Sequence, residues 1–152
     1  MSNIDVVKKF LNTEGVGFES DDELACVRFS FSGETVTWSV LVHDLAESQR
    51  LAVLSFIPSM AEEETRAQVS EFIHRCNYGL VVGNFELDVD TGEIRFRTSA
   101  DLDDIEVNSA LVRNLIYGNV GVVNDYLPGL NKVIHGGMDA ASAIEMIEGP
   151  ST

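Results

Sequence analysis

Two short runs decide the fold of this chain: Gly83-Asn84-Phe85-Glu86-Leu87-Asp88 and Gly92-Glu93-Ile94-Arg95-Phe96-Arg97. Apolar and polar residues alternate in both runs, which is the pattern of strands with one buried face. Asp90-Thr91-Gly92, which leads from the first run into the second, is typical of a tight turn. The sequence therefore predicts an antiparallel β-hairpin, with acidic side chains of the first strand opposite arginines of the second on its polar face.

The residues before this hairpin predict one helix and three further strands. A helical period in residues 1–12 places four apolar side chains on one side of a short first helix. The period then changes to two, which predicts strands at residues 27–31 and 35–43. Residues 51–57 are apolar on both faces, and this pattern favours a strand inside the sheet over one at its edge.

Three further helices are predicted around and after the hairpin. Ser59-Met60-Ala61-Glu62 has the capping-box pattern and predicts the start of a second helix, which Asn77-Tyr78-Gly79 closes. A long helix follows at residues 111–133, where Pro128 is expected to kink or split it. Asp139–Glu148 predicts a last short helix. The expected buried stripe of the long helix consists of Leu111, Leu115, Val122, Tyr126, Leu130 and Val133.

Length and charge limit the class of protein. The chain has 152 residues, and 10 Lys and Arg against 25 Asp and Glu give a net charge of −15. We expect a single α+β domain over residues 1–149, an antiparallel sheet with helices packed on it, and a frayed tail at residues 150–152. The negative field disfavours nucleic acid and membrane surfaces as partners and favours cationic or amphipathic protein segments.

The compartment is inferred from what the sequence lacks. Residues 1–12 have no apolar core or cleavage site of a secretory signal, and no run approaches the about 18 apolar residues of a membrane span. Cys26 and Cys76 have no C-x-x-C partner, so we expect two buried reduced thiols. These observations predict a cytoplasmic protein.

Two acidic motifs each allow a catalytic and a structural interpretation. Asp90-Thr91-Gly92 is the triad of dimeric aspartic proteases, but a hairpin turn requires the same residues. The acidic cluster of residues 101–106 either attracts a divalent cation weakly or stabilises the start of the long helix. No zinc spacing links the histidines, and we expect no metal, no cofactor and no catalytic residue. The three histidines are His43, His74 and His135.

The hairpin has a more specific pattern than strand alternation alone. Gly83 opens an aromatic strand, an acidic-glycine turn follows, and the second strand begins Gly-x-Ile-x-aromatic-Arg. Asn77 ends the preceding helix, Pro128 lies near the end of the long helix, and Gly136 follows that helix. With these motifs the chain resembles the YbjN-like family of small bacterial proteins.

The resemblance extends from Phe10 to Gly149 and implies a fold rather than an activity. The family is similar in fold to type III secretion chaperones, which are acidic, cytoplasmic and typically dimeric, with the order α-β-β-β-α-β-β-α. This chain differs by the extra strand at Leu51–Ile57 and the added helix at Asp139–Glu148. Members of the family are labelled sensory transduction regulators, and no catalytic residues come with the resemblance.

These features lead to a hypothesis of a non-enzymatic, chaperone- or adaptor-like regulator that binds a protein segment as a homodimer. The candidate partner-binding residues are Phe29, Phe31, Trp38, Val40 and Val42, and the alternative is that all five are core. The candidate dimer seam consists of Tyr117, Gly118, Gly121 and Val122. Other functions that stay open are a small-ligand sensor and a dimeric aspartic or metal-dependent hydrolase.

Overall fold

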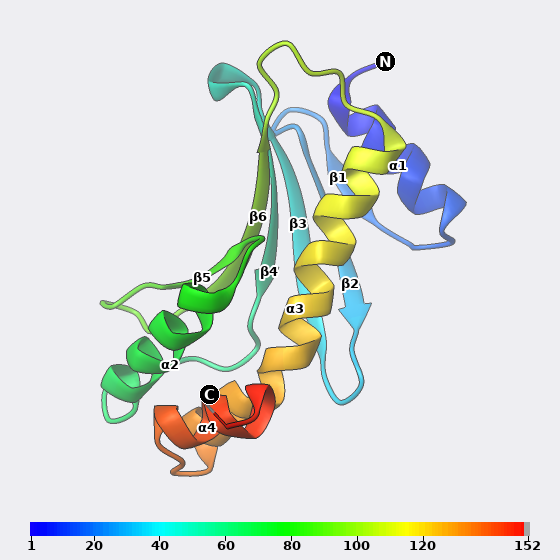
Figure 1. Cartoon of the computed structure of the whole chain (residues 1–152). Coiled ribbons are helices and arrows are strands. Elements are labelled where there is room, and N and C mark those ends of the chain that lie inside the picture. Colours follow the sequence, from blue (N-terminus) through cyan, green and yellow to red (C-terminus); the bar gives the residue numbers. More distant parts are fainter. Residues whose placement is uncertain (151–152) are drawn as a thin grey trace.

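The computed structural model describes residues 1–150, in which helices pack against a single sheet (Figure 1). Of the tail expected at residues 150–152, the last two residues lie outside the described ones. The elements are α1 (Asn3–Thr13), β1 (Glu19–Asp21), β2 (Cys26–Ser32), β3 (Thr37–Leu45), the 3-10 turn η1 (Ala46–Ser48), β4 (Arg50–Phe56), α2 (Arg66–Gly79), β5 (Asn84–Leu87), β6 (Ile94–Asp101), α3 (Ser109–His135) and α4 (Ala140–Glu148).

The sheet has six antiparallel strands in the order β1-β2-β3-β4-β6-β5. The predicted hairpin is present as β5 and β6, with Phe85 opposite Phe96. The strand that is apolar on both faces, β4, lies between β3 and β6, so its predicted interior position is confirmed. The predicted α+β fold is confirmed, while the short exposed edge strand β1 was not foreseen.

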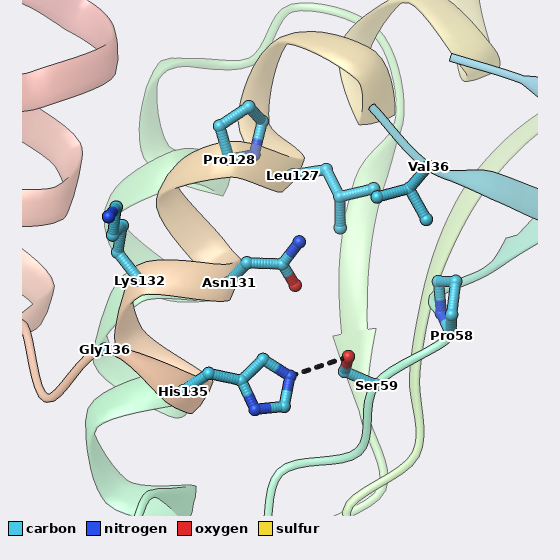
Figure 2. Close-up of a pocket in the computed structure, with 9 residues that line it drawn as sticks. All are labelled: Val36, Pro58, Ser59, Leu127, Pro128, Asn131, Lys132, His135 and Gly136. Carbon is cyan, nitrogen blue, oxygen red and sulfur yellow. Dashed lines mark hydrogen bonds between the residues drawn. The ribbon is translucent and has the colours of Figure 1, made fainter. Parts of the chain in front are cut away.

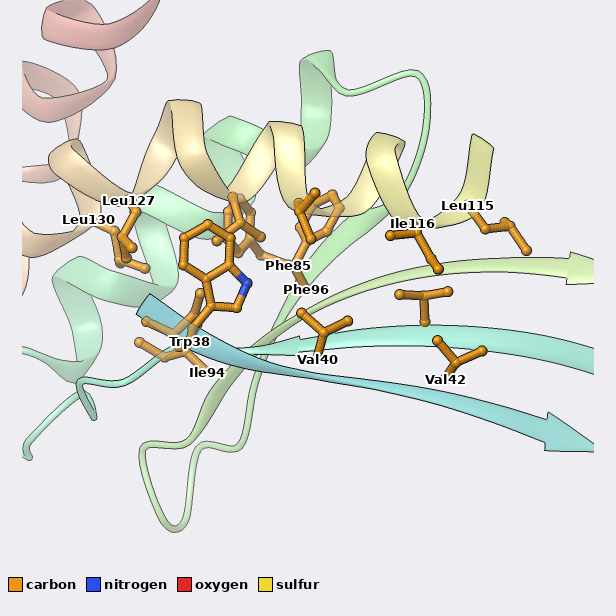
Figure 3. Packing of buried hydrophobic residues seen from close by; sticks show 14 of the residues in the cluster. Trp38, Val40, Val42, Phe85, Ile94, Phe96, Leu115, Ile116, Leu127 and Leu130 are labelled. Atoms are coloured by element: carbon orange, nitrogen blue, oxygen red, sulfur yellow. The ribbon is translucent and has the colours of Figure 1, made fainter. Parts of the chain in front are cut away.

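The core lies between the sheet and the helices (Figure 3). α1 and α3 cover the strand face that carries Trp38, Val40 and Val42, while α2 and α4 pack against each other and α2 contacts β5. Phe85 and Phe96 meet edge to face with ring centroids 4.7 Å apart, which orients the hairpin against the helices.

A buried polar network fixes α3 on the sheet. Asn119 is fully buried, and its amide nitrogen donates to the carbonyl oxygens of Val53 at 2.9 Å and Phe96 at 3.1 Å. Its amide oxygen accepts from the Ser55 hydroxyl at 2.5 Å, and that hydroxyl in turn accepts from the Trp38 indole nitrogen at 2.9 Å. Because buried polar groups are costly when unpaired, this network selects one register of α3 over the sheet.

The predicted start of the second helix at Ser59 is wrong, because α2 begins at Arg66. Ala61 is fully buried, and its N–H donates to the carbonyl of Gly92 in the hairpin turn. The Arg66 guanidinium donates to the Ala61 carbonyl at 3.0 and 3.1 Å. These tertiary bonds hold the segment against the hairpin, and they override the local capping-box signal of the sequence.

Two further predictions about α3 need correction. Pro128 does not split the helix, which continues from Ser109 to His135. The acidic cluster of residues 101–106 precedes the helix, as expected, and Asn108 is the N-cap, whose side chain accepts the Leu111 N–H. The buried side of α3 is also rotated from the predicted stripe and consists of Val112, Leu115, Ile116, Asn119, Val120, Val123, Leu127, Gly129, Leu130, Val133 and Ile134.

Candidate functional site

The strand face proposed for partner binding is packed inside the molecule. Phe29, Trp38, Val40 and Val42 are buried beneath the helices, and Trp38 is only 3% exposed. Phe31 is half-buried, with its ring centroid 5.1 Å from the Trp38 indole. In the folded chain these side chains therefore serve as core, which is the alternative that the sequence left open (Figure 3).

The predicted dimer-seam residues share the outer side of α3. Tyr117 and Gly121 are exposed, and Gly118 and Val122 are half-buried. A Cβ atom at Gly121 would meet nothing within 4 Å, so the backbone of α3 is accessible at this point. The Tyr117 hydroxyl donates to the Glu14 carboxylate at 3.0 Å, and desolvation together with this bond raises the pKa of Tyr117. The structure thus places all four residues on one accessible helix face.

The last turn of α2 and the loop between α2 and β5 expose apolar side chains that the sequence analysis did not single out. Tyr78 is 96% exposed, Val81 97% and Val82 55%. Val82 lies beside α3, with its Cγ1 atom 3.9 Å from the position of a Cβ at Gly118. We name Tyr78, Val81 and Val82 together with the outer α3 residues 117, 118, 121 and 122 the apolar surface. Exposed apolar side chains that gather on one part of a molecule are typical of interaction sites.

Both ends of this loop are anchored, so its exposed side chains are held in place. The Asn77 side chain accepts the Phe85 N–H at 2.8 Å and donates to the Phe85 carbonyl at 3.0 Å. Gly83 has a φ of +75°, and a Cβ there would lie 2.7 Å from the Phe96 ring. Only glycine fits this turn, which gives a structural reason for the glycine-aromatic pattern of the hairpin.

A cavity of about 310 Å³ lies beside the C-terminal turn of α3 (Figure 2). Ser59 Oγ and His135 Nε2 are 2.9 Å apart at its rim, and Val36 and Leu127 form an apolar wall. Within residues 1–150 no acidic side chain bonds the other ring nitrogen of His135. A serine–histidine pair without that orienting carboxylate lacks a part of the catalytic triad, and its evident role is to tie α3 to the segment after β4.

The Asp-Thr-Gly motif forms the hairpin turn. The Asp88 carboxylate accepts the N–H groups of Asp90 at 2.9 Å and Thr91 at 3.2 Å, and these bonds lower the pKa of Asp88. Arg66 donates to the carbonyl oxygens of Val89 and Asp90. The Asp-Thr-Gly motif is therefore explained by turn geometry.

The polar face of the hairpin differs from the predicted pairing, since one carboxylate, that of Glu86, binds both Arg95 and Arg97.

No group of three or more histidine, cysteine, aspartate or glutamate side chains is arranged to hold a metal ion within residues 1–150. In the same range, no helix combines the length and the apolar character that crossing a bilayer would need. Both cysteines are free thiols; Cys76 is buried, whereas Cys26 is half-buried, contrary to the expectation that both are buried.

A comparison with protein-family models shows to which family the chain belongs. The YbjN family model, described as "Putative bacterial sensory transduction regulator", matches residues 3–131. The chain belongs to the YbjN family. Of the motifs that suggested this family, Gly83, Asn77 and the aromatic residues lie at the hairpin, and Pro128 and Gly136 lie in and after α3. Among curated proteins, no sequence matches the chain.

Two solved structures have folds similar to that of this YbjN chain. The ExsC–ExsE complex contains a chain with a TM-score of 0.53 and 16% identity, and the match covers 78% of this chain and 86% of that one. The HopA1–SchA chaperone–effector complex contains a chain with a TM-score of 0.53 and 10% identity, and the match covers 80% of this chain and 92% of that one. At these identities the likeness shows the fold alone. It confirms the predicted type III secretion chaperone-like fold.

Proposed function

We propose that this YbjN protein is a non-enzymatic, homodimeric protein-binding regulator of chaperone or adaptor type that works in the cytoplasm. The observation that carries the proposal is the apolar surface. Tyr78, in the last turn of α2, and Val81, in the anchored loop after it, project almost entirely into solvent, and burying such side chains stabilises a complex by about 25 cal/mol for each Å² of apolar area.

The fold supports a protein partner rather than a reaction. The two similar folds come from complexes between two proteins, and one of these is described as a chaperone–effector complex. Within residues 1–150, the acidic motifs are explained by turns and strand ends, and the serine–histidine pair lacks an orienting acid. The net charge of −15 favours client segments that carry lysine or arginine beside apolar residues.

A second copy of the chain is the proposed occupant of the apolar surface. Gly118 and Gly121 leave the α3 backbone accessible, so two α3 helices related by a two-fold axis can approach closely. Val82 lies beside this helix face and Val81 precedes it in the loop, so the proposed contact would cover both. The client would bind outside this interface, on the acidic surface of the dimer.

Light scattering after size-exclusion chromatography tests the dimer. The wild-type chain is expected to elute with twice its mass of 16.6 kDa, and Val81→Ser with Val82→Ser is expected to shift it to the monomer. Val89→Ser is the matched control, because Val89 is 64% exposed but lies in the hairpin turn. A monomeric wild-type protein, or a Gly121→Leu variant that stays dimeric, would contradict the proposed seam.

Protein binding is tested separately with the tagged chain as bait in a lysate of the source organism. We expect one reproducible partner at low and moderate salt, because apolar contacts persist when ion pairs are screened. The partner should be retained by the control variant Val89→Ser. An absence of any partner at both salt concentrations would remove the adaptor interpretation.

A further inference from the structure

A second concave site lies between α1 and the segment that leads into α3. Its volume is about 550 Å³, within the range of small-molecule sites. Phe10 and Val107 are buried, and Val6 is half-buried beside them, so the cleft has an apolar wall. None of the proposed seam residues lines this cleft, which adjoins the seam through the hydrogen bond from Tyr117 to Glu14.

Charged side chains of both signs line the same cleft. Lys9 comes from α1 and Arg113 from α3, and within residues 1–150 neither of them forms an ion pair. Glu14 and Glu106 face the cleft as well, and Glu14 also accepts the Tyr117 hydroxyl. The cleft thus offers two positive and two negative side chains beside an apolar wall, and Met1, which carries the N-terminal ammonium group, lines it as well.

The start of α3 does not supply the anion site by itself. The Asn108 side chain already accepts the Leu111 N–H at 2.9 Å, so this helix end is capped from within the chain. Recognition of an anion must therefore come from the side chains of Lys9 and Arg113.

From this arrangement we infer that the cleft binds a free apolar amino acid in its zwitterionic form. The carboxylate pairs with Arg113 and Lys9, the ammonium group pairs with Glu106 and Glu14, and the side chain lies against the apolar wall. A purely anionic ligand would meet two uncompensated carboxylates, and a purely cationic one would meet two uncompensated cations. A zwitterion with an apolar side chain gives each of the four charged side chains a group of opposite charge and places its apolar part against the wall.

This inference goes beyond the proposed protein binding, because it adds a small ligand at a separate site. The test measures amide NMR spectra of the full chain during titration with L-leucine and L-phenylalanine. Phenylpropanoate, which lacks the ammonium group, and phenethylamine, which lacks the carboxylate, are the matched probes. We expect saturable shifts confined to α1 and the start of α3, and binding of one of the amino acids about tenfold tighter than of either probe.

Two exposed residues allow variants that fold normally. Arg113→Gln and Glu106→Gln are each expected to weaken amino-acid binding about tenfold, while Arg75→Gln, on α2, leaves it unchanged. The inference is overturned if neither amino acid gives a saturable shift at about 10 mM, or if phenylpropanoate or phenethylamine binds as tightly as the amino acids. Unchanged binding by both glutamine variants would overturn it as well.

Discussion

Replacing Asn119 by alanine is the sharpest test of how α3 is held on the sheet. The side chain is fully buried and takes part in four hydrogen bonds, including a long one of 3.4 Å to the Thr98 hydroxyl. Each buried hydrogen bond contributes about 1 kcal/mol net, and the truncation also leaves a small cavity. We therefore expect Asn119→Ala to lower the free energy of unfolding by about 3–5 kcal/mol.

Urea denaturation followed by circular dichroism measures this loss, and the slope of the transition should stay unchanged. For a chain of this size, the midpoint of thermal unfolding should fall by roughly 10 °C. Asn124→Ala is the control on the same helix, because its half-buried side chain makes a single bond, to the Glu34 N–H at 2.9 Å. It should cost about 1 kcal/mol. A loss below about 1 kcal/mol for Asn119→Ala would refute the network.

Three further outcomes follow from local geometry. Burial raises the pKa of Cys76 to about 12. A thiol reagent at pH 8 should therefore modify the half-buried Cys26 first and react with Cys76 only after unfolding. Equal rates of modification of the two thiols in the native protein would contradict this. Gly92→Ala should lower the free energy of unfolding by about 2 kcal/mol or more, because φ is +83° and the new Cβ would overlap the carbonyl of Ala61. Gly137→Ala is the control: φ is +66° but the Cβ would meet nothing, so the loss measured by urea denaturation should be smaller. Because the pKa of Asp88 is lowered, this carboxylate stabilises the fold above its ordinary pKa of 3.8, and the stabilisation is lost as the pH falls through the pKa of the folded state. In Asp88→Ala, the free energy of unfolding should therefore depend less steeply on pH in the acid range.

The sequence predicts the sheet better than it predicts the helix boundaries. Strand alternation around the Asp-Thr-Gly turn identifies the β5–β6 hairpin, and the doubly apolar run at 51–57 identifies the central strand β4. The start of α2 is misplaced because Ala61 and Arg66 bond to the hairpin turn, and no local pattern reports a contact between segments so far apart in sequence. Hydrogen bonds between distant segments therefore decide where α2 begins, because the local helix propensity leaves its start open.

The candidate sites are less predictable, for two physical reasons. An apolar strand face such as that of Val40 looks the same in sequence whether this chain or a partner covers it. The exposure of Val81 also leaves no trace in the sequence, because the loop has no periodicity that separates inner from outer residues. The cleft between α1 and α3 joins Lys9 and Arg113 only through the packing of two helices, and nothing in the sequence pairs them.

The position of Trp38 gives the molecule an optical reporter of its own. It is the chain's single tryptophan, and its indole is linked through Ser55 to Asn119 on α3. Separation of α3 from the sheet would bring water to this ring, and its fluorescence emission would shift to the red. A client or a second copy that docks without moving α3 should leave the emission spectrum unchanged. A partner that moves α3 away from the sheet would be detected by the change in tryptophan emission, without any added dye.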